Sequence, residues 1–441
     1  MISADRHRGA GRSTLRVVTS HPGKQVIVYN IASQLARRGY LVAHLAAVYY
    51  IPDRIPYRLA QYVPGEAGER LRGQLLKRRC ATVPDQLVVS WPWIELGTRA
   101  LGELPGLRSA LAQGRTYRAA NAAHDRLAAN WLKRRDDIDI VMAFQGSALR
   151  TLQAARKIGA RAVLVATHPL SHERIVAAEY AKFGQRAPLP LREHLLSEVR
   201  AADCLLTAST ATTDGLLESG VSEDRIKELP YGIDVPASTT IPVRAVRAEV
   251  RFLFVGKLSL HKGLHVLRQA WSSIVLPNVR LTLVGRPVGD VEAKILREWK
   301  DDRVTVVDEV PDINAAYRDA DVFVFPSLIE GFGMVTLEAM AAGLPVIVTE
   351  RSRGVVRHGV DGFVVRPGDA EDLARRMIQL AEEPRLRAEL SSRASECAKQ
   401  YTWDRFGSKL CDWLDDLVPS SERPRRSGAT TMKLEGLGDG R

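Results

Sequence analysis

Two lysines in the second half of the 441-residue chain have the spacing of a site for a diphosphate. Lys257 and Lys262 lie in the segment FLFVGKLSLHKG, where a predicted strand ends in a loop that leads into a predicted helix. The first turn of a helix exposes unpaired N–H groups and a partial positive charge, so two adjacent lysines there favour a phosphate ligand. Two solvated lysines on a surface loop are the alternative, and this loop alone does not decide between the two. The order of a Walker loop is absent, so no motif supports an ATPase.

Two glutamates follow in a second segment that alternates strand, loop, helix and strand, FVFPSLIEGFGMVTLEAMAAGLPVIV (323–348). Glu330 begins the turn EGFG, whose glycines allow backbone amides to approach a ligand closely. Glu338 lies eight residues further on, in a helix predicted over 336–342. Carboxylates accept hydrogen bonds from hydroxyls, so the pair suits a sugar-rich ligand. Glu338 as an ordinary solvated residue is the alternative, but its neighbours are apolar, and an unpaired charge buried there would be costly.

The elements that must position these residues form a regular pattern. Short β-branched segments alternate with amphipathic segments in both halves, which predicts two doubly wound domains with parallel sheets covered on both faces. The predicted strands are 15–20, 41–47, 138–144, 161–167 and 204–209 in the first half and 251–256, 280–285, 304–310, 322–327 and 345–349 in the second. The named helices are 26–39, 69–79, 116–135, 265–273, 369–382 and 403–417, and PASTTIPVRA (236–245) is the predicted linker.

Composition limits the class of protein. Apolar residues make up 45% of the chain and charged residues 26%, as in a globular protein with a sizeable core. The apolar runs have the length of strands, too short for a membrane-spanning helix, and the first residues lack a signal peptide, so we expect a cytoplasmic protein. Four scattered cysteines favour neither a disulfide framework nor a zinc site. With no His/Asp cluster at metal spacing, we also expect no metal dependence.

The net charge of +12 is concentrated in the first half of the chain. Residues 1–240 contain 33 Lys/Arg and 22 Asp/Glu, whereas residues 241–441 contain 30 and 29. Such an excess raises the hypothesis of nucleic-acid binding, but no recognised module is present and the positive charge is not organised with aromatic residues for base stacking, so no nucleic-acid partner is expected.

An anionic membrane surface is a second candidate partner for the basic half. RLRGQLLKRR (70–79) and RLAANWLKRR (126–135) are similar to basic amphipathic helices that lie on membranes. Trp91, Trp93 and Trp131 could add interfacial anchors. The alternative is a solvated arginine-rich face, and the sequence does not distinguish the two.

Together these motifs resemble those of a known family. Gly256-Lys257…Lys262-Gly263 and Glu330-Gly-Phe-Gly…Glu338 are similar to the donor-site motifs of retaining glycosyltransferases of family 4. Further segments occur in the family's usual order over about residues 15–417, namely AADCLLTAS (201–209), LPYGID (229–234), LVG (283–285), ADVFVFPS (320–327) and DGFVVRPGDAEDLA (361–374).

The resemblance implies an α/β architecture of the GT-B type, with two Rossmann-like, doubly wound parallel-sheet domains that face a central cleft. It implies an acceptor domain over 14–236 and a nucleotide-sugar donor domain over 246–400. A C-terminal helix over 401–418 would cross back to the first domain. Residues 419–441 are polar and rich in Gly and Ser, which predicts a disordered tail.

Roles in the donor site also follow from the resemblance, at the positions that match. Lys257 and Lys262 would bind the diphosphate, although the family usually has arginine at the first position, with its bidentate grip. Glu338 would accept hydrogen bonds from the ribose hydroxyls. Glu330 would hold hydroxyls of the donor sugar, while three following amides approach the sugar and phosphate, those of Gly331, Phe332 and Gly333.

The first domain would contribute two further positions. His168, in VATHP after a predicted strand, matches the family's active-site histidine near donor sugar and acceptor, and a helix-cap or packing role is its alternative. Gly23 lies with His21 in TSHPGKQ after the first strand, where the family usually has a longer Gly-rich loop against the donor. His168, Glu330 and Lys262 are therefore the predicted catalytic residues.

The implied activity is metal-independent transfer of a hexose, with retention, from a UDP- or GDP-sugar to an acceptor hydroxyl. The nucleotide-sugar is a substrate, so no cofactor is expected. The acceptor would be a saccharide or lipid-linked precursor, in synthesis of a bacterial envelope or exopolysaccharide. An epimerase-like enzyme of the same fold that modifies nucleotide-sugars is the alternative.

Overall fold

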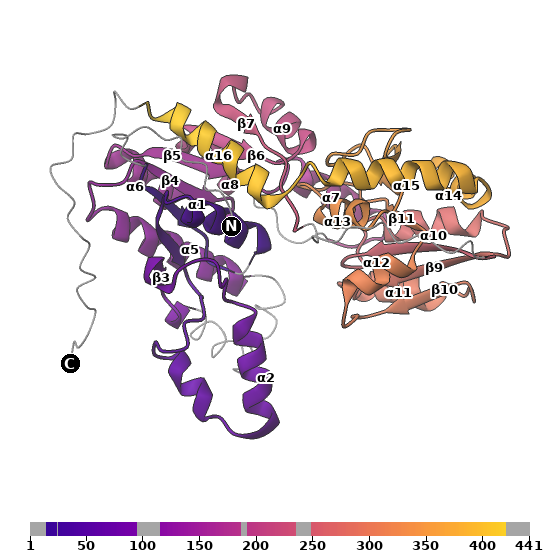
Figure 1. Cartoon of the computed structure of the whole chain (residues 1–441), viewed down its shortest axis with the longest axis horizontal. Helices are drawn as coiled ribbons and strands as arrows, with labels where there is room; N and C mark the ends of the chain where they lie inside the picture. The colour runs from indigo at the N-terminus through magenta and orange to yellow at the C-terminus, as the bar shows by residue number, and fades with distance from the viewer. Residues whose placement is uncertain (1–14, 24, 95–114, 187–191, 235–247, 420–441) are drawn as a thin grey trace, which may run out of the picture.

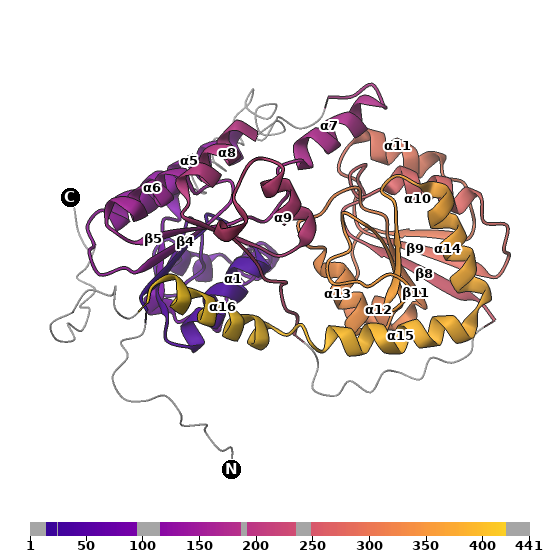
Figure 2. The ribbon, with the colours of Figure 1, turned by 90° about the horizontal axis from the view of Figure 1, so that it is seen from above.

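The computed structural model describes residues 15–23, 25–94, 115–186, 192–234 and 248–419. In these ranges the chain forms two lobes, each built on a parallel sheet with helices on both faces (Figures 1 and 2). The linker predicted at 236–245 and, apart from Pro419, the predicted tail lie outside the described residues.

The first sheet has the strand order β3-β2-β1-β4-β5-β6-β7, and its neighbouring strands all pair in parallel. Its strands are β1 (Val17–Ser20), β2 (Leu41–Ala46), β3 (Val88–Ser90), β4 (Ile140–Phe144), β5 (Arg161–Val165), β6 (Cys204–Thr207) and β7 (Ile226–Glu228). The helices of this lobe are α1 (Val26–Arg37), α2 (Gly65–Leu76), α5 (Arg115–Leu132), α6 (Leu149–Lys157), α7 (His172–Ala181), α8 (Arg192–Ala201) and α9 (Thr210–Leu217).

The second sheet repeats the pattern with the order β10-β9-β8-β11-β12-β13. Its strands are β8 (Val250–Val255), β9 (Val279–Val284), β10 (Val304–Val307), β11 (Val322–Phe325), β12 (Val346–Thr349) and β13 (Gly362–Val365). The helices that follow are α10 (Leu264–Ser272), α11 (Asp290–Glu298), α12 (Ile313–Asp319), α13 (Met334–Ala341), α14 (Ala370–Glu382), α15 (Pro384–Ala398) and α16 (Trp403–Leu417).

The predicted fold class is confirmed, and each of the ten predicted strands is present. The prediction missed β3, β7 and β13, which have three or four residues each and lie at sheet edges. An edge strand has a pairing neighbour on one side only, so it can be short and partly polar, as IKE in β7 is.

Strand order places the two halves of the site. In each sheet the order reverses beside the first strand, between β1 and β4 and between β8 and β11. Ligands of open α/β sheets bind in the crevice outside the carboxyl ends of the strands at such a point. The segments at 256–263 and 326–333, which contain the predicted lysines and Glu330, follow β8 and β11 there.

Helix α16 lies against the first lobe although it follows the second in sequence (Figure 2). Arg38 Nη2, next to α1, donates to Asp404 Oδ1 at 2.7 Å, and the Tyr40 hydroxyl donates to Asp415 Oδ2 at 2.7 Å. The chain therefore passes between the lobes twice, and the segment that returns to α16 is bonded to the first lobe, because Ile233 N donates to Tyr401 O at 2.9 Å.

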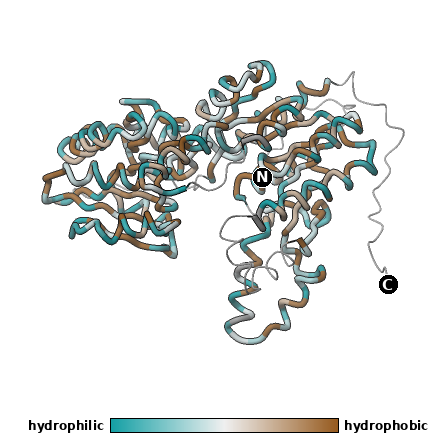
Figure 3. The backbone as a smooth tube through the Cα atoms, turned by 180° about the vertical axis from the view of Figure 1, so that it is seen from behind, coloured by the Kyte–Doolittle hydropathy of each residue, from teal (hydrophilic) through white to brown (hydrophobic). Residues whose placement is uncertain are grey.

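An arm formed by residues 54–79 projects from the first lobe and contains α2 (Figure 1). It carries seven Lys/Arg and two Glu. Among these charges stand exposed apolar side chains, and Figure 3 shows hydrophobic and hydrophilic positions intermixed along the arm. Its most exposed apolar residues are Ile55, Leu59, Tyr62 and Leu76. No helix in the described ranges is long and apolar enough to span a bilayer.

Three histidines are buried in the first lobe at the end of β1, and His21 is the first residue of the loop that follows this strand. His44 Nδ1 lies 2.8 Å from Thr19 Oγ1, and His124 Nε2 lies 3.0 Å from Ser20 Oγ. Burial lowers the pKa of His21 to about 4 and the pKa values of His44 and His124 to about 3. All three rings are therefore neutral at pH 7.

The buried histidines predict a loss of stability in mild acid. Below an unfolded pKa near 6.5 the unfolded chain binds protons that the folded chain excludes, so the free energy of unfolding falls as pH drops toward 4. The limit is about 1.4 kcal/mol per pH unit for each histidine. Urea unfolding between pH 7 and pH 5 measures this slope. His124→Gln, which cannot titrate, should give a shallower slope, and equal slopes would contradict the assignment.

Candidate active site

The loop from Gly256 to Gly263 holds the first group of predicted residues. Gly263 has φ of +78°, and a Cβ there would overlap the carbonyl oxygen of Pro326, so both the backbone and the space require glycine. Gly263 is also the N-cap of α10. Leu328 N donates to His261 O at 2.8 Å, and Ser327 Oγ lies 3.1 Å from the same oxygen, which ties this loop to the segment after β11.

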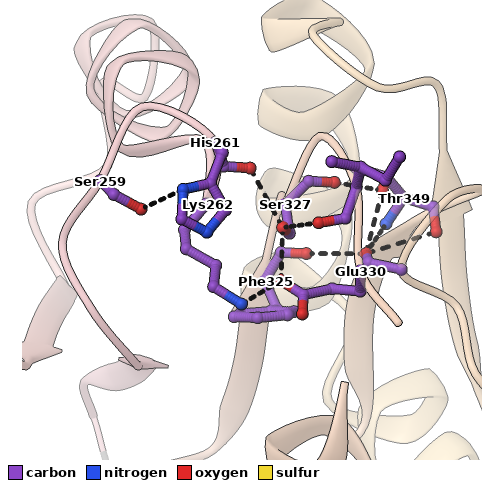
Figure 4. A network of polar contacts seen from close by, with 9 residues as sticks. Ser259, His261, Lys262, Phe325, Ser327, Glu330 and Thr349 are labelled. Carbon is purple, nitrogen blue, oxygen red and sulfur yellow. Dashed lines mark hydrogen bonds and ion pairs between the residues drawn. The ribbon is translucent and has the colours of Figure 1, made fainter. Parts of the chain in front are cut away.

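Lys262 and Glu330, 68 positions apart in sequence, form an ion pair at the crevice (Figure 4). Their side chains are 19% and 12% exposed. Ser327 Oγ donates to the same carboxylate oxygen, Glu330 Oε1, at 2.7 Å. Burial by itself raises the pKa of Glu330, but the Lys262 ammonium and the hydrogen bonds from Lys262 and Ser327 outweigh it and hold the pKa below its usual range. Glu330 is therefore ionised, and its ionisation depends on the Lys262 ammonium.

Hydroxyl groups on the neighbouring strand ends support this pair (Figure 4). Thr349 Oγ1, at the end of β12, donates to the carbonyl of Ser327, and Ser352 Oγ lies 2.9 Å from Thr349 Oγ1. Hydrogen bonds at both its carbonyl oxygen and its hydroxyl group therefore hold Ser327 in place. The sequence analysis assigned no role to these residues. A Ser two residues after a buried strand and three residues before Glu330 was the available signal.

The other two charged residues predicted for the donor site lie apart from that ion pair. Lys257 is exposed and forms no hydrogen bond or ion pair with the described residues. Glu338 is partly buried in α13, and its Oε2 accepts a hydrogen bond from the Tyr317 hydroxyl at 3.0 Å. Burial raises the pKa of Glu338, and the bond from Tyr317 opposes the rise in part. The apolar surroundings of Glu338 were expected, and Tyr317 is the partner that sequence reasoning missed.

The EGFG turn contacts the first lobe directly. Ser209 Oγ and Thr212 Oγ1, at the start of α9, donate to Gly331 O at 2.5 and 3.2 Å. A Cβ on Gly331 would overlap the carbonyl oxygen of Thr167. The lobes therefore meet at this glycine, with backbone against backbone.

Its neighbours in the turn are placed differently. Phe332 is buried, with its ring centroid 5.4 Å from that of Tyr231. Gly333 has φ of +80° and is the N-cap of α13.

His168 lies in the loop after β5, on the first-lobe side of the same junction. The backbone N–H groups of Thr167 and His168 both donate to Gln145 Oε1 at 3.0 Å, and Thr167 Oγ1 lies 2.9 Å from His168 Nδ1. Water reaches the ring, yet the surrounding protein lowers the pKa of His168, with Glu330 acting to raise it and Lys262 to lower it. The ring is neutral at pH 7 and lies within electrostatic range of the ion pair.

Two further histidines continue from His168 toward the second lobe. His172 lies with its ring centroid 5.6 Å from that of His168 and 5.6 Å from that of His261. Burial lowers the pKa of His172 to about 4 and that of His261 to about 3. Sequence reasoning missed both, although His172 follows His168 by four residues, one helical turn.

A cavity of about 570 Å³ in the first lobe adjoins these histidines. His168 and His172 line it together with Gln145, Arg150 and Leu195. Gly23, the other first-lobe position expected near the donor, is not among its lining residues. Gly23 N donates to His21 Nδ1 at 3.0 Å, inside the loop after β1.

The junction at Gly331 generates a prediction. Gly331→Ala should lower turnover about a hundredfold, because its Cβ forces Thr167 and His168 away from the turn and misplaces groups that must meet. Steady-state rates and thermal unfolding measure the effect. Gly73→Ala is the matched control, since no atom lies within 4 Å of a Cβ at this exposed position in α2. Equal activity of the two variants would contradict the role of this junction.

Part of the chain is similar to known proteins. Residues 249–383 match the family described as Glycosyl transferases group 1. D-inositol 3-phosphate glycosyltransferase of Pseudarthrobacter chlorophenolicus is 32% identical, over 46% of this chain and 53% of that protein. Phosphatidyl-myo-inositol mannosyltransferase of Mycolicibacterium smegmatis is 32% identical, over 46% and 55%. The chain thus spans about half the length of these curated relatives.

Solved structures resemble the whole architecture. Anabaena Alr3699/HepE in complex with UDP has a TM-score of 0.61 and 18% identity and covers 92% of this chain and 100% of its own. The lipopolysaccharide outer core galactosyltransferase WaaB has a TM-score of 0.62 and 14% identity, with the same coverage. At such identity the likeness establishes the fold. The chain has the GT-B fold, and residues 249–383 of its second lobe are similar to the glycosyl transferases group 1 family.

Proposed function

We propose that this protein is a retaining, metal-independent glycosyltransferase of family 4 that transfers a hexose from a UDP- or GDP-sugar to an acceptor hydroxyl. The observation that carries the proposal is the meeting of Lys262 and Glu330 at the crevice of the second sheet, beside His168 of the first lobe. A cation for phosphate and a carboxylate for sugar hydroxyls are the two groups that a nucleotide-sugar needs.

Donor binding would exchange the ion pair for contacts with the substrate. The Lys262 ammonium would turn to the diphosphate, joined by Lys257, which has no competing partner among the described residues. Glu330, released from Lys262 but still bonded to Ser327, would accept from the sugar hydroxyls. Glu338 would use Oε1 for the ribose, since Tyr317 occupies Oε2.

The chemistry needs no protein nucleophile. The bond between the anomeric carbon and the diphosphate oxygen breaks, the acceptor oxygen bonds to the anomeric carbon on the same face, and the acceptor proton passes to the departing diphosphate. Negative charge develops on the leaving group, where the lysines and the N-terminus of α10 would stabilise it. These groups would supply the positive charge that a metal provides elsewhere, which supports metal independence.

The acceptor would bind in the first lobe. The cavity lined by His168 and His172 lies on that side of the junction, and neutral rings can donate or accept hydrogen bonds without adding charge beside the donor. The curated relatives include a phosphatidyl-myo-inositol mannosyltransferase and a capsular polysaccharide biosynthesis glycosyltransferase of Staphylococcus aureus. They support a lipid-linked or polysaccharide precursor as acceptor.

For a lipid-linked acceptor, we propose that the arm rests on an anionic membrane on the inner face of the cell. Seven basic residues accompany its exposed apolar side chains. Of the three tryptophans considered above, Trp93 is 64% exposed, whereas Trp91 and Trp131 pack against the core. The apolar anchors would therefore be Leu59, Tyr62 and Leu76 with Trp93.

The ion pair predicts the loss of activity on its removal. Lys262→Ala, Glu330→Ala and the double variant should each reduce turnover by at least about a hundredfold. The double variant leaves no unpaired buried charge and is the one expected to stay closest to wild type in stability. Release of nucleoside diphosphate from a panel of nucleotide-sugars, with and without EDTA, measures activity, and circular dichroism measures folding.

A matched pair elsewhere provides the control. Lys399 and Glu396 form an exposed ion pair at 3.0 Å in α15 and the residue after it, so Lys399→Ala should change neither activity nor stability appreciably. An active double variant at 262 and 330 would overturn the proposal. Release of an epimerised nucleotide-sugar without transfer would favour the epimerase-like alternative.

The arm predicts reversible membrane binding. Wild-type protein should sediment with liposomes that contain anionic phospholipid at low salt, and less so as salt rises. Leu59→Ser with Leu76→Ser should reduce the bound fraction several-fold. Val275→Ser with Val288→Ser, at exposed apolar positions on the second lobe, is the control and should bind like wild type. Absence of wild-type binding at low salt would remove the membrane contact.

A further inference from the structure

Helix α7 lies between β5 and β6 of the first sheet in sequence but is bonded to the second lobe. Figure 2 shows α7 beside α10 and α11. Near its C-terminal end the Tyr180 hydroxyl donates to Glu292 Oε1 of α11 at 2.9 Å, and Glu179 Oε1 lies 2.7 Å from His265 Nε2 of α10. Lys182 Nζ, 2.9 Å from Glu179 Oε2, completes the second contact.

Glu292 connects Tyr180 to the loop that contains Lys262. Its Oε1 accepts from the Tyr180 hydroxyl and also from Leu260 N, at 3.2 Å. Leu260 is fully buried and lies two residues before Lys262. Glu292 is itself 1% exposed, and its Oε2 has no hydrogen-bond partner among the described residues. Burial of a carboxylate with one oxygen that accepts no hydrogen bond costs free energy, so both hydrogen bonds to Oε1 matter for the placement of Glu292.

The other end of α7 touches the same loop. The helix begins at His172, which packs against His261, the neighbour of Lys262. His261 Nδ1 in turn lies 3.0 Å from Ser259 Oγ. Helix α7 therefore contacts the segment 259–265 at both ends, from the first lobe.

We propose that Tyr180 and Glu292 are positioning residues for the donor diphosphate, which act by fixing the backbone of the loop at Leu260 and hence the place of Lys262. This inference rests on the proposed function. Docking of α7 through Tyr180 orients the Glu292 carboxylate, and the carboxylate holds the Leu260 amide. The first lobe thereby contributes to nucleotide binding without touching the nucleotide.

The coupling follows from the geometry of the shared acceptor. When a carboxylate loses one of two hydrogen-bond donors to the same oxygen, its side chain can rotate about its terminal torsion angles. The remaining hydrogen bond then becomes longer or less linear. Lys262 lies two residues along the same turn, where Lys262 N donates to Ser259 O at 3.1 Å and Gly263 N to Leu260 O at 2.9 Å. A shift at Leu260 therefore moves the lysine relative to any phosphate held by the loop.

The test compares two conservative tyrosine variants. Tyr180→Phe removes the hydroxyl that donates to Glu292, and Tyr40→Phe removes one that donates to Asp415 of α16 at 2.7 Å, remote from the loop. Binding of UDP, GDP and ADP by titration calorimetry, and KM for the donor, are measured together with thermal unfolding. Tyr180→Phe should weaken binding of the preferred diphosphate and raise donor KM about tenfold, with a smaller change in kcat. Tyr40→Phe should leave both at wild-type values.

Substitutions at Glu292 provide the rescue. Glu292→Ala removes the acceptor from both donors and should weaken nucleotide binding at least as much as Tyr180→Phe. Glu292→Gln keeps an oxygen for Leu260 N and the tyrosine hydroxyl and should recover most of the affinity. In the combined Tyr180→Phe and Glu292→Ala variant the losses should not add, because both act through one contact.

The outcomes separate two kinds of failure. If the wild type binds none of the three diphosphates, the proposed function fails and the inference fails with it. If the wild type binds one of them and Tyr180→Phe binds it equally well, the inference alone is overturned. Equal losses of thermal stability in Tyr180→Phe and Tyr40→Phe, with unchanged nucleotide affinity in both, would likewise overturn it, since the bond to Glu292 would then serve folding only.

Discussion

The buried pair of Lys262 and Glu330 is the interaction on which the rest of the site depends. Neither charge is stable in its surroundings alone, because each side chain is less than one-fifth exposed. Glycine at 263 brings the loop onto Pro326, and the hydroxyls of Ser327 and Thr349 hold the glutamate side. The lysine and the glutamate neutralise each other inside the protein. A ligand that separates them must therefore offer an anionic partner to the ammonium and hydrogen-bond donors to the carboxylate. A phosphate joined to a hydroxyl-bearing sugar does so.

The contact between the lobes adds a second constraint at the same place. Gly331 of the turn that carries Glu330 accepts hydrogen bonds from α9 and lies against the backbone of Thr167, so His168 approaches the ion pair only when this junction is made. Helix α7 makes a further junction behind the lysine loop, through Tyr180 and Glu292. The proposed donor site therefore has its charged residues on one lobe and receives supporting contacts from the other.

Much of the architecture follows from local pattern, whereas the partners do not. Strand and helix periodicity located ten strands, and the order of strands then brought Lys262 and Glu330 to one crevice. Edge strands such as β7 were not predicted, because a segment of three residues is too short to show the alternation of a strand. Tyr317, His172 and Glu292 were missed for another reason. Each contacts a residue that is distant in the sequence but adjacent in the fold, and no spacing in a single sequence reports such a contact.

Backbone packing without side chains holds the lobes together at a second place, beside the start of α16. Ile233 and Tyr401 are joined by a backbone hydrogen bond, and a Cβ on Gly232 would overlap the backbone at Thr402 and Trp403. Thr402 is the N-cap of α16, the helix that lies against the first lobe. Glycine at 232 is therefore as necessary to the seat of α16 as glycine at 331 is to the contact with Thr167, because at both positions a facing backbone leaves no room for a side chain.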